Sequence, residues 1–196
     1  LQVVDLFTGE HYQPPFDAIN PNHLVPVLED GNFRLTESSA ILKYLADKAG
    51  SPAYPKDLQQ RARVNERMDW INTQLNRDLA YGLVYPQAFP HHKRPSEEAQ
   101  QATLAWAKER AAGWLQVLND HLLGPQNAYL CGDKISIADY YGAPFVALAG
   151  VIGSDLGAYP NVRRWLGSMK SLKTWTKTNE IIDGFAGSLS GPFVTV

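Results

Sequence analysis

The sequence of 196 residues has one cysteine, two methionines and no long apolar run. With Cys131 alone, no disulfide can form within the chain, and the usual zinc-binding cysteine spacings are absent. No stretch approaches the roughly 20 apolar residues of a membrane helix, and residues 1–11 lack the basic and apolar regions of a secretory signal. These absences exclude a disulfide scaffold and a membrane-spanning protein, and they favour a soluble protein of the cytoplasm.

An excess of charge of either sign is also missing. The chain carries 18 basic and 20 acidic residues, a formal net charge of −2, and the charges are interspersed rather than grouped. Without a basic patch, binding to nucleic acid or to an acidic membrane surface is not expected. The hydrophobic content of 44% suffices for one or two buried cores.

The stretch 20–39 carries the most specific pattern. Two alternating apolar runs, 25–27 and 33–35, flank Asp30-Gly31, which predicts a hairpin with a two-residue turn. A cis geometry is accessible to an X-Pro bond such as Val25-Pro26. A cis turn would leave the backbone N–H and C=O of Val25 facing outward, where they could pair with an extended peptide.

A helix is predicted directly after this hairpin. It opens at 36–39 with a Thr-Glu-Ser-Ser sequence and stops at Gly50. A helix N-terminus attracts a carboxylate; the hydroxyls of Ser38 and Ser39 add donors, and Glu37 could accept from an ammonium group. The pattern therefore favours a receptor for a small zwitterionic peptide, although residues 36–39 could equally do no more than cap the helix.

The two motifs NPNHLVPVLEDG and LTESSAILKYL resemble the glutathione-binding half of the cytosolic glutathione transferases. Together with Gly9-Glu10-His11, they are similar to the theta and delta-like bacterial branch. This resemblance implies an α/β thioredoxin-like N-terminal domain, an all-α helical C-terminal domain and a homodimer. It also implies glutathione as co-substrate, a small hydrophobic electrophile as second substrate, and no metal.

The resemblance also implies roles for individual residues. The expected glutathione contacts are His11, His23, Val25, Pro26, Glu37, Ser38 and Ser39. His11 and His23 would reach the glycine carboxylate, with more of the contact on His23 because Leu24 stands where many relatives have lysine. Ser39 stands where some delta-like proteins have arginine.

A pocket for the electrophile is expected at Tyr81 and Tyr85, near Phe89. Aromatic residues at helical spacing fit a packed core equally well. The nearby run 91–94, His-His-Lys-Arg, is interpreted as a polar loop, and Cys131 as a structural thiol.

Residues 1–6 have the composition of a strand, but the resemblance places this strand beside a central one that would precede it. Unpaired ladder groups cost free energy, so we expect the natural chain to begin before Leu1, with one further strand and helix. The catalytic serine, tyrosine or cysteine of the family would lie in that segment, and we therefore name no catalytic residue.

The predicted domain organisation is a partial glutathione-binding domain over 1–49, a linker over 50–57 and a helical domain over 58–196. Helices are expected from 58 to 85, ending before Pro86, from 96 to 122, from 160 to 169 and from 172 to 182. Ser136 to Asp139 predicts a capping box at the start of a further helix. The Gly- and Ser-rich tail 184–196 is expected to be loosely ordered or to lie between the domains.

The sequence thus predicts an enzyme that joins the glutathione thiolate to hydrophobic electrophiles. Two alternatives remain open at this point. One is a glutathione-dependent thiol-disulfide oxidoreductase, and the other is a non-catalytic binding module of the same fold.

Overall fold

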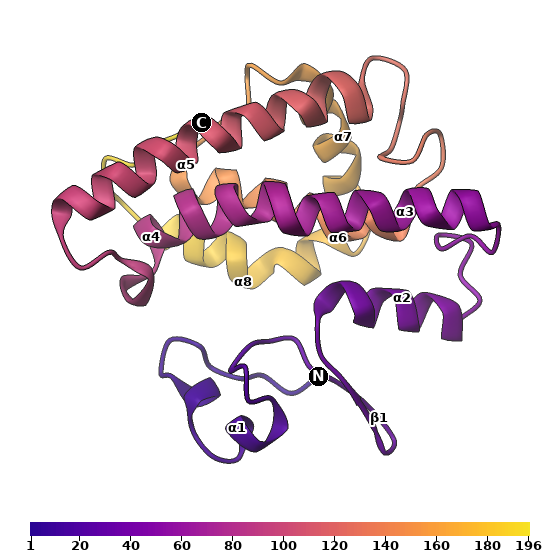
Figure 1. Cartoon of the computed structure of the whole chain (residues 1–196), viewed down its shortest axis with the longest axis horizontal. Coiled ribbons are helices and arrows are strands. Elements are labelled where there is room, and N and C mark those ends of the chain that lie inside the picture. Colours follow the sequence, from indigo (N-terminus) through magenta and orange to yellow (C-terminus); the bar gives the residue numbers. More distant parts are fainter. The chain divides into compact units, whose positions relative to one another are not determined.

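The computed structural model describes residues 1–196 and consists of two compact units, Leu1–Tyr54 and Pro55–Val196 (Figure 1). The division falls inside the segment 50–57 that we predicted as a linker. None of the helices is both long enough and apolar enough to span a bilayer.

Unit 1 contains the predicted hairpin in a shorter form. Strand β1 (Leu28–Asp30) pairs antiparallel with β2 (Phe33–Leu35), and the register aligns Asp30 with Phe33. The turn is therefore Gly31-Asn32, one residue later than predicted, because Gly31 supplies the positive φ of 61° that the turn needs. The ladder begins only at Leu28, so the first run, 25–27, contributes no residue to it.

The predicted helix after the hairpin is confirmed as α2 (Ser38–Lys48). The carboxylate of Asp30 links it to the hairpin by accepting hydrogen bonds from the Tyr44 hydroxyl at 2.6 Å and from Lys48. These two donors lower the pKa of Asp30. The geometry of the hairpin relative to α2 is therefore set by a charged contact as well as by the short chain between them.

The predicted strand over residues 1–6 is wrong. A strand requires ladder hydrogen bonds to a neighbour, and these residues make none; the Asp5 amide instead donates to the Glu10 carboxylate at 2.7 Å. The chain then forms the short helices η1 (Glu10–Tyr12) and α1 (Phe16–Ile19).

Unit 2 is entirely helical apart from one isolated bridge. Its first helix runs without interruption through α3 (Leu58–Trp70), η2 (Ile71–Val84) and α4 (Tyr85–Ala88), followed by η3 (Pro90–His92). The second comprises α5 (Glu97–Val117) and η4 (Leu118–Leu123). The remaining elements are α6 (Ile137–Ala147), η5 (Leu148–Ile152), α7 (Pro160–Lys170) and α8 (Trp175–Ser188).

We predicted that the first long helix ends before Pro86, but this is wrong, because the helix continues to Ala88. Pro86 lies near the C-terminal end of this continuous helix, which goes on for two more residues, Gln87 and Ala88, so the missing N–H of proline removes one hydrogen bond without ending the helix. The predicted apolar stripe of this helix is confirmed, since Val64, Met68, Ile71, Leu75, Leu79 and Leu83 are all buried. Helix α5 packs closely against η2 at Gly82, where an added Cβ would lie 2.8 Å from the Cβ of Ala107.

The predicted capping box is confirmed and does more than cap α6. Asp139 is fully buried, and its carboxylate accepts from the Ser136 amide at 2.8 Å and the Ser136 hydroxyl at 3.0 Å. It also accepts from the Leu130 amide at 2.8 Å and from Trp165 Nε1 at 2.9 Å. One side chain therefore joins the loop before α6, the start of α6 and helix α7.

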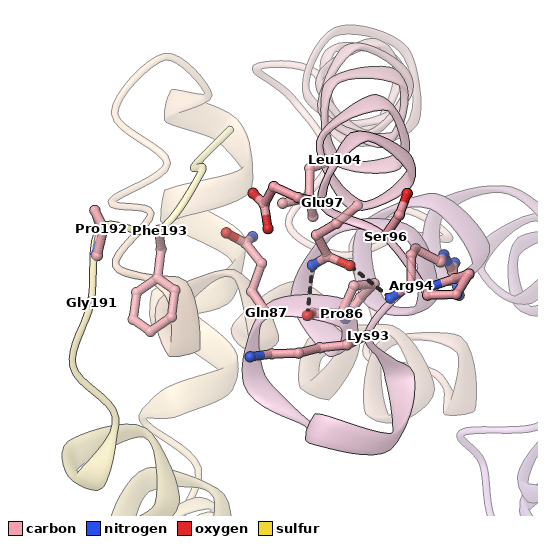
Figure 2. A pocket seen from close by; sticks show the side chains of 12 residues that line it. Pro86, Gln87, Lys93, Arg94, Ser96, Glu97, Leu104, Gly191, Pro192 and Phe193 are labelled. Carbon is pink, nitrogen blue, oxygen red and sulfur yellow. Dashed lines mark hydrogen bonds between the residues drawn. The ribbon is translucent and has the colours of Figure 1, made fainter.

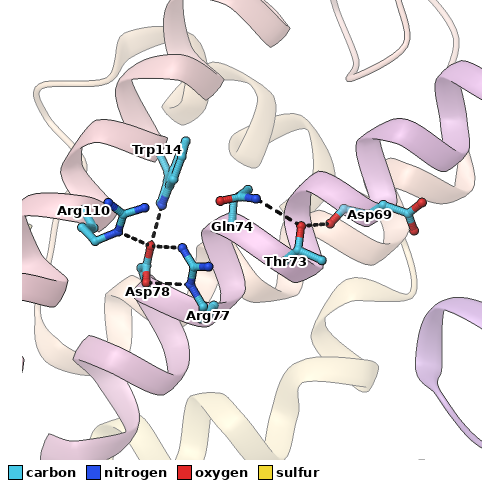
Figure 3. Close-up of polar contacts among 7 residues, drawn as sticks. All are labelled: Asp69, Thr73, Gln74, Arg77, Asp78, Arg110 and Trp114. Atoms are coloured by element: carbon cyan, nitrogen blue, oxygen red, sulfur yellow. Dashed lines mark hydrogen bonds and ion pairs between the residues drawn. The ribbon is translucent and has the colours of Figure 1, made fainter.

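A second buried carboxylate, Asp78, joins η2 to α5 (Figure 3). It accepts two hydrogen bonds from Arg77 at 3.0 Å each, one from Arg110 Nε at 3.1 Å and one from Trp114 Nε1 at 2.6 Å. Burial acts to raise the pKa of Asp78, but the hydrogen bonds from Arg77, Trp114 and Arg110 outweigh it and lower the pKa.

The C-terminal tail differs from the expectation of loose order. Helix α8 extends to Ser188, and the residues after it are held within unit 2. The Gln87 side chain donates to the Val194 carbonyl at 3.0 Å and accepts from the Val194 amide at 2.8 Å, and the Val196 amide donates to the Ser154 hydroxyl at 3.2 Å. The Gly- and Ser-rich composition of the tail does not show that a glutamine distant in the sequence pairs with its main chain.

Substitution of Asp139 by alanine is expected to destabilise the protein by about 3–5 kcal/mol, because it leaves the buried donors of Leu130, Ser136 and Trp165 without an acceptor. Urea unfolding followed by the helical circular dichroism signal measures this change. The matched control is Asp133→Ala at an exposed site, expected within about 0.5 kcal/mol of the parent. Equal effects of the two substitutions would contradict the role given to Asp139.

Candidate functional site

The loop before the hairpin brings the two predicted histidines together. His23 Nδ1 lies 2.9 Å from the carbonyl oxygen of His11, and the Tyr12 ring packs against both imidazoles, with centroid distances of 4.0 Å to His11 and 5.1 Å to His23. The buried Asn20 holds this loop by donating to the Leu24 carbonyl at 2.7 Å. Sequence reasoning did not assign a role to Asn20 or Tyr12.

His11 is more buried than a loop histidine usually is. Only 6% of the residue is exposed, and its Nδ1 is a buried polar atom without a hydrogen-bond partner. Buried polar atoms in proteins are nearly always paired, so an unpaired one needs a physical explanation. A bound polar ligand that reaches the imidazole would supply the missing partner.

The hairpin register places the remaining predicted contacts at one end of the sheet. The last ladder pair is Leu28 with Leu35. Val25 and Pro26 lie just before β1, and Glu37 and Ser38 lie just after β2, so both segments adjoin this end of the hairpin. The ladder stops before these residues, the Val25-Pro26 bond is cis as expected, and Val25 is 41% exposed.

The turn into α2 contains a strained residue. Glu37 has φ 65° and ψ 108°, a conformation that a non-glycine residue adopts at a cost of about 1–3 kcal/mol. The Glu37 side chain is exposed and does not cap the helix. Strain of this kind is found mostly at binding and active sites, where it aims a side chain.

The side chains of Glu37, Ser38 and Ser39 form no hydrogen bond within the protein. The alternative in which residues 36–39 only cap α2 therefore does not describe this structure. A carboxylate and two hydroxyls remain available at a helix N-terminus, beside a stretch of unpaired main chain. Such a set can hold an ammonium group, a carboxylate and a peptide backbone at once.

The predicted pair of tyrosines belongs to a larger aromatic cluster in unit 2. Tyr81 and Tyr85 lie 4.9 Å apart between ring centroids, and Tyr85 contacts Phe89 at 5.3 Å. Phe89 stacks on Phe185 of α8 at 5.0 Å. We call Tyr81, Tyr85, Phe89, His92 and Phe185 the aromatic cluster. Its surface is accessible, since Tyr81 is 43% exposed, while burial raises the pKa of the Tyr85 hydroxyl to about 12.

His92 was missed because we interpreted residues 91–94 as a polar loop. The short helix η3 turns its imidazole onto the rings of Tyr85 at 5.2 Å and Tyr81 at 5.9 Å. Burial lowers the pKa of His92, and the neighbouring His91 and Arg94 lower it further. Near neutral pH the cluster therefore presents an uncharged imidazole. Aromatic spacing of four between Tyr81, Tyr85 and Phe89 was the only signal in the sequence that pointed to this region.

Cys131 is not suited to thiol chemistry in this structure. It lies in unit 2, partly buried, and burial raises the pKa of its thiol. A raised pKa keeps the thiol protonated, whereas the thiolate is the reactive form.

We expect His92 to titrate below its ordinary pKa of 6.5. The unfolded chain binds this proton more readily than the folded one, so the stability contributed by neutral His92 is present above pH 6.5 and declines as the pH falls below it. Proton NMR titration of the imidazole measures the pKa, and Arg94→Gln should raise it because one neighbouring charge is removed. An unchanged stability–pH profile in His92→Phe would contradict this assignment.

Both halves of the chain match profiles of one family. Residues 2–47 match the glutathione S-transferase N-terminal domain, and residues 68–173 match the glutathione S-transferase C-terminal domain. Over 141 residues, or 71% of this chain, the sequence is 42% identical to human glutathione S-transferase theta-1. The chain spans 58% of the length of that relative.

Solved structures agree with the sequence matches. Human glutathione transferase theta-2, in a complex with glutathione and an unknown ligand, superposes with a TM-score of 0.81 at 30% identity, covering 95% of this chain and 78% of that one. A delta-class glutathione transferase from Nilaparvata lugens superposes with a TM-score of 0.76 at 31% identity, covering 95% and 84%. The chain belongs to the glutathione S-transferase family, with a thioredoxin-like unit 1 and a helical unit 2, and it is similar to theta- and delta-class members.

Proposed function

We propose that this protein is a glutathione transferase that adds the glutathione thiolate to hydrophobic electrophiles. The observation that carries the proposal is the open end of the hairpin, which is flanked by an exposed Val25 before β1 and by a strained Glu37 and an unpaired Ser38 side chain after β2. The relatives support it, because human theta-2 transferase has been solved with glutathione bound.

Each part of glutathione has a matching group in unit 1. The main chain of Val25 pairs with the backbone of the central cysteine of the tripeptide, as an added strand would. Glu37 accepts from the γ-glutamyl ammonium, while Ser38, Ser39 and the α2 N-terminus hold the carboxylate. His11 and His23 hold the glycine carboxylate at the other end. Contacts at both ends fix the position of the sulfur between them.

The contribution of these unit 1 residues to the reaction is to bind glutathione and to position its sulfur. The glutathione thiol gives its proton to solvent water, the thiolate sulfur forms a bond to an electrophilic carbon, and the leaving group departs from that carbon with the bonding electrons. Binding both partners in a productive geometry replaces a bimolecular encounter by a reaction within the complex. We propose that the apolar part of the electrophile packs on the aromatic cluster, chiefly on Tyr81 and Tyr85, and that the protein acts in the cytoplasm.

The double substitution Glu37→Ala and Ser38→Ala is expected to weaken glutathione binding at least tenfold, because it removes two charge-assisted contacts to the γ-glutamyl group. Isothermal titration calorimetry of the full-length protein with glutathione measures the dissociation constant. Conjugation of glutathione to 1-chloro-2,4-dinitrobenzene, followed by absorbance, tests the activity in the same samples.

The matched control is Glu29→Ala with Arg34→Ala, which removes an exposed ion pair from the same hairpin and should leave binding unchanged. Glutathione binding without conjugation would favour the non-catalytic binding module. Absence of binding to the folded parent protein would refute the proposal as a whole.

We further propose that the protein forms a homodimer through a face of η2 and α5, as its family relationship suggests. Trp106 is 55% exposed, and the guanidinium of Arg110 stacks on both Trp106 at 5.0 Å and Trp114 at 5.3 Å. The Asp78 carboxylate lies between Arg110 and Arg77 and accepts hydrogen bonds from both (Figure 3). Exposed tryptophan beside ordered arginine is the composition of an interface hot spot.

Substitution Trp106→Ala should raise the dimer dissociation constant by at least about tenfold, because hot-spot tryptophans dominate interface energies. Sedimentation velocity over a range of concentrations measures this constant. Tyr140→Ala, which truncates an exposed aromatic residue of α6, is the control and should have no effect. A parent protein that sediments as a monomer at all concentrations would rule the dimer out.

A further inference from the structure

Tyr12 connects His11 and His23, the two histidines proposed to hold the glycine carboxylate, although they come from different segments of unit 1. His11 belongs to the short helix η1, whereas His23 lies in the loop before the hairpin. The centroid of the Tyr12 ring lies 4.0 Å from that of His11 and 5.1 Å from that of His23, and its plane makes angles of 44° and 40° with them. One tyrosine ring therefore packs against both imidazoles at once.

The main chain fixes the orientation of the His23 imidazole. Its Nδ1 lies 2.9 Å from the His11 carbonyl oxygen, and since a carbonyl can only accept, Nδ1 carries the hydrogen. The backbone at His23 has a φ of 56°, in the left-handed region, and the His23 amide donates to the Asn20 carbonyl at 2.9 Å. Nε2 is consequently the nitrogen of His23 that remains for a ligand, and it forms no hydrogen bond within the protein.

His11 offers a second nitrogen of this kind. Neither nitrogen of its ring forms a hydrogen bond within the protein, and only Nδ1 is fully buried, so Nε2 is the nitrogen that a ligand can reach. A carboxylate has two oxygens and can accept from two donors. The two imidazoles therefore match one carboxylate, provided that their spacing is maintained.

Tyr12 is placed to maintain that spacing and is not part of the core. It is 56% exposed, and its hydroxyl forms no hydrogen bond within the protein. Its ring packs on the two imidazoles and on no other aromatic ring. An exposed side chain adds little to stability through burial, so its contacts with the histidines are the feature that needs an explanation.

We propose that Tyr12 is a positioning residue for the glycine end of glutathione, whose ring holds the imidazoles of His11 and His23 at the spacing at which both Nε2 atoms reach one carboxylate. Tyr12 thereby makes the site prefer a peptide that ends in glycine over one that lacks this residue. This role rests on the proposed binding of glutathione by unit 1, and it requires no contact between Tyr12 and the peptide.

Isothermal titration calorimetry of the protein with glutathione, and with γ-glutamylcysteine, which lacks the glycine, tests this role. The parent should bind glutathione more tightly than γ-glutamylcysteine. Tyr12→Ala should weaken glutathione binding about tenfold, as for the loss of one charge-assisted contact, and should leave the affinity for γ-glutamylcysteine unchanged. The unchanged affinity would also show that the variant is folded, because γ-glutamylcysteine still uses Glu37 and Ser38.

Two further variants separate positioning from other roles. Tyr12→Phe keeps the ring and loses only the hydroxyl, so it should bind glutathione as the parent does. Added to His23→Ala, the Tyr12→Ala substitution should cost less affinity than it does in the parent, because one of the imidazoles that it positions is gone. The matched control is Phe33→Ala, which truncates an exposed aromatic residue at the turn end of the hairpin and should change neither affinity.

Equal weakening of both peptides by Tyr12→Ala would overturn this role of Tyr12 while leaving the proposed glutathione binding intact. So would a loss in Tyr12→Phe as large as that in Tyr12→Ala, because the hydroxyl rather than the ring would then be responsible. An undiminished effect of Tyr12→Ala in the His23→Ala background would also contradict it. A parent protein that binds neither peptide would refute the proposed function itself, and the role of Tyr12 with it.

Discussion

The structure of unit 2 depends above all on the buried carboxylate of Asp139. Four hydrogen bonds from three parts of the chain converge on it, so the loop before α6, the start of α6 and helix α7 cannot move independently. A charged group in the core is tolerated only when its hydrogen bonds are satisfied, and the same requirement makes the arrangement specific. The buried Asp78 carboxylate likewise joins η2 to α5, because it accepts hydrogen bonds from Arg110 and Trp114 of α5.

Unit 1 differs from unit 2, because several of its polar groups have no hydrogen-bond partner within the protein. The hairpin has only three residues per strand, and its ladder ends where the candidate glutathione contacts begin. Unpaired main chain, a strained Glu37 and a partly unsatisfied His11 are unfavourable in a protein without a ligand. Together they fit a surface whose remaining partners come from a bound peptide.

The loop from α4 to α5 serves two different surfaces. Its η3 turn carries His92 into the aromatic cluster, while the next residue, Lys93, lines a cavity of about 360 Å³ between the first turns of α5 and the C-terminal tail (Figure 2). Gln87 lies two residues after Tyr85 of the cluster and holds the tail through Val194. A short segment therefore positions both an apolar surface and a cationic one, because successive residues of a tight turn point in different directions.

Local patterns in the sequence predicted the hairpin, helix α2, the apolar stripe of the first long helix and the Asp139 capping box, because each depends on residues a few positions apart. The motif around Val25-Pro26 and Glu37-Ser38 also sufficed to identify the family. Other features were decided only by the tertiary structure. Residues 1–6 form no strand, the first long helix continues through Pro86, and Glu37 has a strained backbone. The His92 ring packs in the aromatic cluster, and the C-terminal tail is attached to unit 2 through Gln87. Each of these depends on partners distant in the chain, or on a backbone conformation to which the residue type gives no preference, so no local pattern could have shown it.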